Sequence, residues 1–121
     1  MGRTGTLSRR ASMALALAAG AWAGAAAAQT AAPAPAATVS AGRDTFNGQC
    51  AHCHGGDATQ TEEPRNLRQL STRYGKDARL AFDVTVREGR PGTLMQSWAD
   101  LFTDEEIARI WAFLESVQGK N

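Results

Sequence analysis

The chain has 121 residues, which is enough for one small domain but too few for two. Its 13 Lys and Arg residues against 12 Asp and Glu residues give a formal net charge of +1, so there is no electrostatic basis for a nucleic-acid-binding role. The two cysteines, Cys50 and Cys53, lie three positions apart and therefore cannot form a long-range disulfide framework.

The N-terminal residues have the organisation of an export signal. Arg3, Arg9 and Arg10 are the only charged residues before Arg43, and an uncharged, Ala-rich stretch separates them from a run of small residues ending at Ala28. We therefore predict that residues 1–28 are a cleaved signal peptide and that no membrane span remains in the mature chain. An uncleaved anchor is the less favoured alternative, because the stretch is barely long enough to span and Ala is only weakly apolar.

A Pro- and Ala-rich segment follows the signal. Residues 29–38 predict a disordered tether, because Pro33 and Pro35 interrupt any helix there. Residues 39–119 then form the predicted folded domain. A core of about 80 residues is marginal by itself, so the domain needs a metal or a large apolar cofactor for support.

The folded domain is predicted to be helical. Ser40 is placed to cap a helix from Ala41 into Cys50, with Gly42 and Phe46 on one face of that helix.

Loops and short helices are expected in the middle of the domain. A polar loop covers residues 55–65, and a short helical turn follows at 67–70. The apolar residues of 77–88 fit the spacing of either a helix or a strand; we predict a helix, because no second strand is available for pairing. Residues 89–92 end it, and 93–102 are irregular.

The last predicted helix begins with a capping box. Thr103 is its N-cap and Glu106 follows three residues later. The broad apolar face of this helix comprises Ile107, Ile110, Trp111, Phe113, Leu114 and Val117.

The segment Cys50-Ala51-His52-Cys53-His54 has the C-x-x-C-H signature of covalent haem attachment. Two thiols add to the two vinyl groups of haem, and the next imidazole must reach the iron. On a helical turn Cys50, Cys53 and His54 occupy positions i, i+3 and i+4, so the three side chains point the same way.

Other uses of two cysteines fit less well. A zinc site needs four protein ligands, and the chain has no second Cys or His pair. A thioredoxin-like motif belongs in a βαβ pattern, which the sequence lacks. A disulfide within C-x-x-C would leave His54 unexplained.

The second axial ligand of the iron follows by elimination. His54 takes one side of the ring, and His52 is held in the same short segment and cannot reach the other side. Met1 and Met13 leave with the signal peptide, so Met95 is the remaining soft donor, in a loop that contains Gly and Pro. His and Met are the usual axial pair of electron-transfer cytochromes.

With these residues, the chain resembles a small soluble class I cytochrome c over residues 39–118. The resemblance implies an all-α fold in which short helices wrap one covalently bound haem and the N- and C-terminal helices cross. It is carried by the C-x-x-C-H segment, Gly42 and Phe46, the loop with Met95, and residues 110–114.

The family also implies two specific contacts. The crossing helices should meet through Gly42 and Phe46 against Ile110 and Phe113. Family members place a Pro carbonyl on the free nitrogen of the ligand His, with Asn-Leu close behind. Here Pro64-Arg65-Asn66-Leu67 has one residue between Pro and Asn, so either the Pro64 or the Arg65 carbonyl is a candidate partner.

A closer similarity is to cytochromes c that accept electrons from periplasmic alcohol dehydrogenases containing pyrroloquinoline quinone (PQQ). It rests on Asn66-Leu67, Arg73-Tyr74-Gly75, Val86, Gly89-Arg90-Pro91, Met95, Trp98 and Phe102-Thr103-Asp104. It implies a periplasmic electron carrier rather than an enzyme, with a cytochrome or terminal oxidase as electron acceptor. Arg90, Tyr74 and Trp98 are candidate donors to the haem propionates.

Two other functions remain open. One is a haem subunit or docking module held permanently by a larger dehydrogenase or oxidase. The other, which we favour least, is a haem sensor or peroxidase in which Met95 is displaced.

The expected docking surface is small and apolar. It surrounds the exposed haem edge and includes residues 91–94. The first 28 residues hold three of the 13 basic residues and none of the 12 acidic ones, so without them the net charge is −2. That charge is too small for strong steering, and we expect only mild salt dependence of electron transfer.

Overall fold

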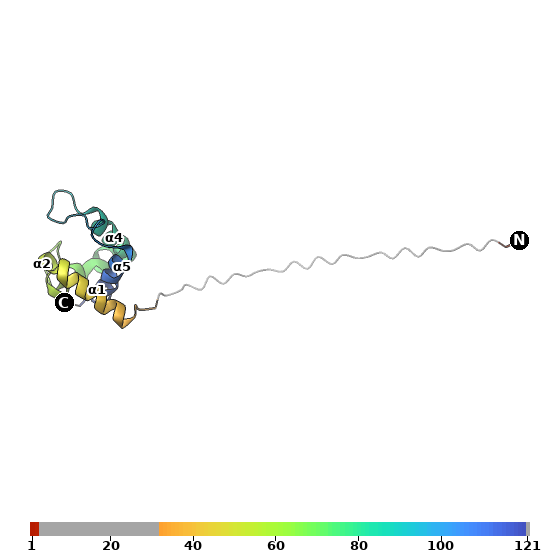
Figure 1. Ribbon diagram of the computed structural model, residues 1–121, viewed down its shortest axis with the longest axis horizontal. Coiled ribbons are helices and arrows are strands. Elements are labelled where there is room, and N and C mark those ends of the chain that lie inside the picture. Colours follow the sequence, from red (N-terminus) through yellow and green to blue (C-terminus); the bar gives the residue numbers. More distant parts are fainter. Residues whose placement is uncertain (3–31, 121) are drawn as a thin grey trace. The chain divides into compact units, whose positions relative to one another are not determined.

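Helices account for all the regular structure in residues 32–120, where no strand is described (Figure 1). The computed structural model describes residues 1–2 and 32–120, so the predicted signal peptide and the start of the tether lie outside the described residues, apart from residues 1–2. The longer helices are α1 (Ala36–Gln49), α4 (Ala78–Glu88) and α5 (Asp104–Ser116). The short ones are α2 (Ala51–His54), η1 (Gly56–Ala58), η2 (Leu67–Gln69), α3 (Leu70–Tyr74) and η3 (Gly75–Asp77). The predicted all-α class is confirmed.

Helix α1 begins earlier than predicted. It starts at Ala36 with Pro35 as its N-cap, and the Pro35 carbonyl accepts hydrogen bonds from the backbone of Thr38 and Val39 at 2.9 and 3.1 Å. Residues 36–38 therefore belong to α1, and their assignment to a disordered tether was wrong, as was the assignment of Ser40 as the cap. Proline lacks the N–H that a helix start leaves unpaired, and the alanines that follow favour helix.

Helices α1 and α5 pack against each other (Figure 1), and their backbones come close together at Gly42. A Cβ atom at Gly42 would lie 1.8 Å from the backbone oxygen of Arg109 and 3.0 Å from the backbone nitrogen of Ile110, so only glycine allows this approach. One turn later Phe46 packs against Phe113, with 5.3 Å between the ring centroids. The crossing predicted for Gly42 and Phe46 is confirmed.

Helix α4 contributes one apolar face to the core. Ala78, Phe82 and Val86 are buried at a spacing of four residues, and the Phe82 ring lies 5.4 Å from that of Trp111 on α5. Gly89 ends the helix with a φ of 73°. The helix predicted for residues 77–88 is therefore confirmed, with its first helical residue at Ala78.

The start of α5 is fixed by the predicted capping box. The Thr103 hydroxyl accepts a hydrogen bond from the Glu106 backbone at 3.2 Å, and the Glu106 carboxylate accepts one from the Thr103 backbone at 2.8 Å. The apolar residues predicted for this helix are buried from Ile107 to Leu114, and Val117 packs against their edge.

Candidate functional site

The C-x-x-C-H segment forms a helical turn at the junction of α1 and α2. The backbone carbonyl of Cys50 accepts hydrogen bonds from the backbone N–H groups of Cys53 and His54 at 3.2 and 3.0 Å. The side chains of Cys50, Cys53 and His54 line one cavity, whereas His52 is exposed and does not. Cys50 and Cys53 are not joined by a disulfide, and burial raises the pKa of the Cys50 thiol to about 11.

The cavity has a volume of about 420 Å³, which lies within the range of about 300–1,000 Å³ typical of small-molecule and cofactor sites. Its wall is mainly apolar and includes Phe46, Leu67, Leu70, Phe82, Val86 and Ile110. Met95 reaches the same cavity from the loop between α4 and α5. The structure thus brings Cys50, Cys53, His54 and Met95 together, although Met95 is distant from the others in sequence.

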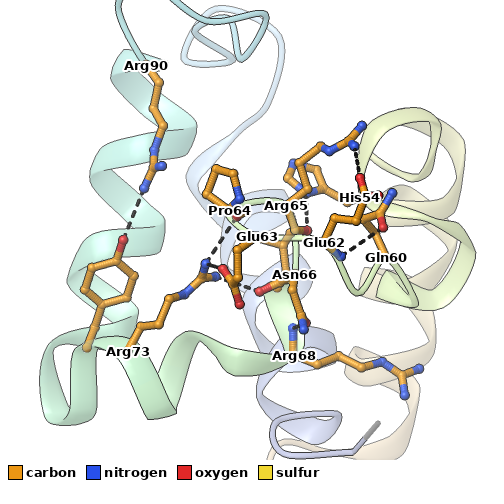
Figure 2. Close-up of polar contacts among 12 residues, drawn as sticks. His54, Gln60, Glu62, Glu63, Pro64, Arg65, Asn66, Arg68, Arg73 and Arg90 are labelled. Atoms are coloured by element: carbon orange, nitrogen blue, oxygen red, sulfur yellow. Dashed lines mark hydrogen bonds and ion pairs between the residues drawn. The ribbon is translucent and has the colours of Figure 1, made fainter.

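The orientation of His54 is set by a backbone hydrogen bond. Its Nδ1 donates to the carbonyl of Arg65 at 2.9 Å, so Arg65 rather than Pro64 is the partner (Figure 2). Burial lowers the pKa of His54, and the positive charges of Arg65 and Arg90 act in the same direction, whereas the bond to Arg65 opposes them. A neutral ring that donates from Nδ1 keeps the lone pair of Nε2 free for a metal.

The loop that carries Met95 is closed on itself. The Arg90 backbone donates to the Met95 carbonyl at 2.8 Å, and the Met95 backbone donates to the Thr93 hydroxyl at 3.1 Å. A Cβ atom at Gly89 would lie 2.7 Å from the Met95 carbonyl oxygen, so glycine is needed where the loop leaves α4. Met95 is half-buried against the core, and Leu94 beside it is 95% exposed.

Three arginines line the cavity with different partners (Figure 2). Arg65 pairs with Glu62, and Arg73 pairs with Glu63. Among the described residues, the guanidinium of Arg90 has the neutral hydroxyl of Tyr74 as its partner, at 3.2 Å, and no carboxylate.

The buried Nε of Arg73 has no hydrogen-bond partner in the described part of the chain. With an apolar wall, two thiols, an imidazole, a thioether and polar groups left to bind an anion, the cavity fits haem. Sequence reasoning missed the wall residues Leu67, Leu70 and Phe82, because their apolar character fits an ordinary core equally well.

The structure bears on two of the alternatives considered from the sequence, a zinc site and a thioredoxin-like motif. No group of three or more His, Cys, Asp or Glu side chains within residues 32–120 is arranged to hold a metal ion. The same part of the chain has no strand for a thioredoxin-like βαβ unit. Among the described helices, none combines the length and apolar character needed to cross a membrane.

Two comparisons with known proteins give matches. The protein family described as “Cytochrome C oxidase, cbb3-type, subunit III” matches residues 37–114. The chain is also 32% identical over 77 residues to a protein named “Cytochrome c6” from Bryopsis maxima, an alignment that covers 63% of this chain and 88% of the relative. The comparison with solved structures gives no match.

Proposed function

The chain belongs to the c-type cytochrome family, whose members carry covalently attached haem c and transfer electrons rather than act as enzymes, and we propose that it is a single-haem electron carrier of the periplasm. The observation that carries the proposal is the shared cavity, which gathers Cys50, Cys53, His54 and Met95 from two distant segments.

Each of the four residues has a role in this proposal. Cys50 and Cys53 would hold the haem through thioether bonds, and His54 and Met95 would supply the two protein ligands of its iron. The haem iron supplies one-electron chemistry by alternating between Fe(II) and Fe(III). Met95 fills the position that an oxygen-activating or sensing haem protein leaves open, and a thioether ligand favours Fe(II).

Other cavity residues support the same role. Apolar walls such as Phe46, Phe82 and Ile110 exclude water, which also keeps the potential positive. Arg90, Tyr74 and Trp98, the candidates for binding the haem propionates, all line the cavity. Arg73 joins them, because its Nε is buried without a partner in the described residues.

Replacing the proposed sixth ligand tests the site. Met95→Ala should leave the sixth coordination position of the iron free, so that the reduced protein binds carbon monoxide and the reduction potential falls. Leu101→Ala is the control, because Leu101 is an exposed apolar residue of the same inter-helix segment and does not line the cavity. An unchanged spectrum and potential in Met95→Ala would show that another group holds the sixth position.

Attachment through the thiols has its own test. Haem should remain on the chain after acid-acetone extraction and denaturing electrophoresis, because a thioether bond survives both. Release of the haem would contradict the roles of Cys50 and Cys53.

The cellular setting belongs to the proposal as well. Residues 1–28 act as a cleaved signal peptide and residues 39–119 as the cytochrome domain, with the start of α1 lying just before it. The donor is a quinoprotein (PQQ) alcohol dehydrogenase, and the acceptor is a cytochrome or terminal oxidase of the respiratory chain. Stopped-flow mixing of the oxidised protein with a reduced periplasmic quinoprotein tests the donor; no faster reduction than by a small-molecule reductant would contradict it.

A second candidate is a haem subunit held permanently by a larger complex. The matched family takes its description from an oxidase subunit, and this is the observation that supports the second candidate. Gel filtration of detergent-free and membrane extracts distinguishes them. Elution as a small free protein supports the carrier, whereas elution with an oxidase or dehydrogenase supports the subunit.

A further inference from the structure

The chain reverses direction directly after His54 through an unusual backbone conformation. Asp57 has φ 54° and ψ 26°, and Ala58 has φ 59°, so two successive non-glycine residues occupy the left-handed region. Such residues are unfavourable unless their surroundings hold them, and they cluster at functional sites. Ala58 is completely buried, so the reversal carries its methyl group into the core.

The polar groups of Asp57 form hydrogen bonds with side chains of α1 and with Arg68. Its carboxylate accepts hydrogen bonds from Arg43 Nε at 2.7 Å, from a second nitrogen of the same guanidinium, and from Asn47 Nδ2 at 2.7 Å. Its backbone N–H donates to Asn47 Oδ1 at 2.8 Å, and its carbonyl accepts from Arg68 at 2.9 Å. Arg43 and Asn47 lie one turn apart on α1, so they present one face to the reversal.

The end of the reversal is hydrogen-bonded back to the backbone of His54. The Gln60 backbone donates to the His54 carbonyl at 3.0 Å, and the Ala58 backbone donates to the Gly55 carbonyl at 3.0 Å. Gly55 has a φ of 75°, and a Cβ atom there would lie 2.7 Å from the Gln60 nitrogen, so this loop is tightly closed. The backbone of His54 is therefore fixed on its C-terminal side by the segment that Asp57 holds.

We propose that Asp57 is a positioning residue for His54, acting through Arg43 and Asn47 to hold the backbone from which the imidazole reaches the cavity. An exposed ion pair contributes little stability, so its value here lies in geometry rather than in energy. Arg65 fixes the ring through Nδ1, and the Asp57 contacts fix the backbone that carries the ring. The inference rests on the proposed function, in which Nε2 of His54 ligates the haem iron.

Substitutions at Asp57 test this in the haem-loaded protein. Asp57→Ala should raise the hydrogen-exchange rate of the Gln60 amide by about tenfold through local opening, and should shift the hyperfine NMR signals of the His54 ring in the oxidised state. Asp57→Asn should have smaller effects, because Asn tolerates the left-handed region and its amide oxygen still accepts hydrogen bonds. Asp83→Ala is the matched control, since Asp83 also pairs with an arginine, Arg79, but both residues lie on α4 rather than on the loop that follows His54.

The outcomes distinguish a residue that positions His54 from one that only stabilises the fold. Wild-type His54 signals and Gln60 exchange in a folded Asp57→Ala protein would overturn the inference, even if its stability were reduced. Where Asp57→Ala does not fold, Arg43→Gln removes the ion pair while leaving Asp57 in place, and the same two readouts apply. Absence of hyperfine-shifted His54 signals in the wild type would instead overturn ligation by His54, and Gln60 exchange alone would then decide whether Asp57 holds this backbone.

Discussion

Gly42→Ala is expected to destabilise the protein, although alanine is the better helix former. The added Cβ would lie 1.8 Å from the Arg109 carbonyl oxygen, which belongs to the backbone of α5, so the two helices must separate. Overpacking of this kind costs about 1–3 kcal/mol, and separation weakens the Phe46–Phe113 ring contact, a contribution of about 0.5–1.5 kcal/mol. The higher helix propensity of alanine recovers about 1 kcal/mol. We therefore expect a net loss of about 2 kcal/mol.

Gly48→Ala is the matched control, because Gly48 lies in the same helix and a Cβ atom there would meet nothing within 4 Å. That change should stabilise the protein slightly. Urea denaturation of the haem-loaded proteins, followed by circular dichroism, measures both effects, and a loss of about 2 kcal/mol should lower the melting temperature by roughly 10 °C in a domain of this size. If Gly42→Ala proved as stable as Gly48→Ala, the close approach of α1 and α5 would be refuted.

Three further predictions concern the helix cap, the docking surface and acid stability. Thr103→Ala should lower the free energy of unfolding by about 1 kcal/mol, as measured by urea denaturation, because the capping box is lost. Leu94→Glu should slow electron transfer from a periplasmic quinoprotein in stopped-flow experiments, whereas Leu80→Glu, at an exposed leucine outside the cavity, should not; equal rates for all three proteins would exclude the Leu94 surface. Arg43 holds the pKa of the Asp57 carboxyl well below its usual value, so its stabilising effect is present above the unfolded-state pKa of about 3.9 and is lost as the pH falls below it. Because the pair is exposed, Asp57→Asn should flatten this part of the pH–stability profile only slightly, and a steeper acid limb in the variant would count against the Asp57 interaction.

Features determined by neighbouring residues were predictable from the sequence. The capping box at Thr103 and Glu106 depends on residues three apart, and the structure contains both of its hydrogen bonds. The shared direction of Cys50, Cys53 and His54 follows from one helical turn. The crossing at Gly42 is a long-range contact, and it was predictable only through the resemblance to a known family.

Features determined by tertiary contacts were not predictable in the same way. Ser40 has a better capping side chain than Pro35, yet the helix begins before Ser40, at Ala36. Val39, in the additional first turn, packs against the core. Spacing alone left the carbonyl partner of His54 open, and the fold selects Arg65. The role of Asp57 depends on Arg43 and Asn47 of a different element, and nothing in the local sequence indicates that they meet.

The cavity and the hydrophobic core share the same side chains. Phe46, Phe82 and Ile110 are buried by other helices on one side and line the cavity on the other. A core of about 80 residues is marginal without added apolar mass, and a haem held in this cavity would supply it where these side chains otherwise meet water. The residues that would exclude water from the iron are therefore also those through which the haem would stabilise the fold. The same side-chain contacts would set both the reduction potential and the stability of the domain.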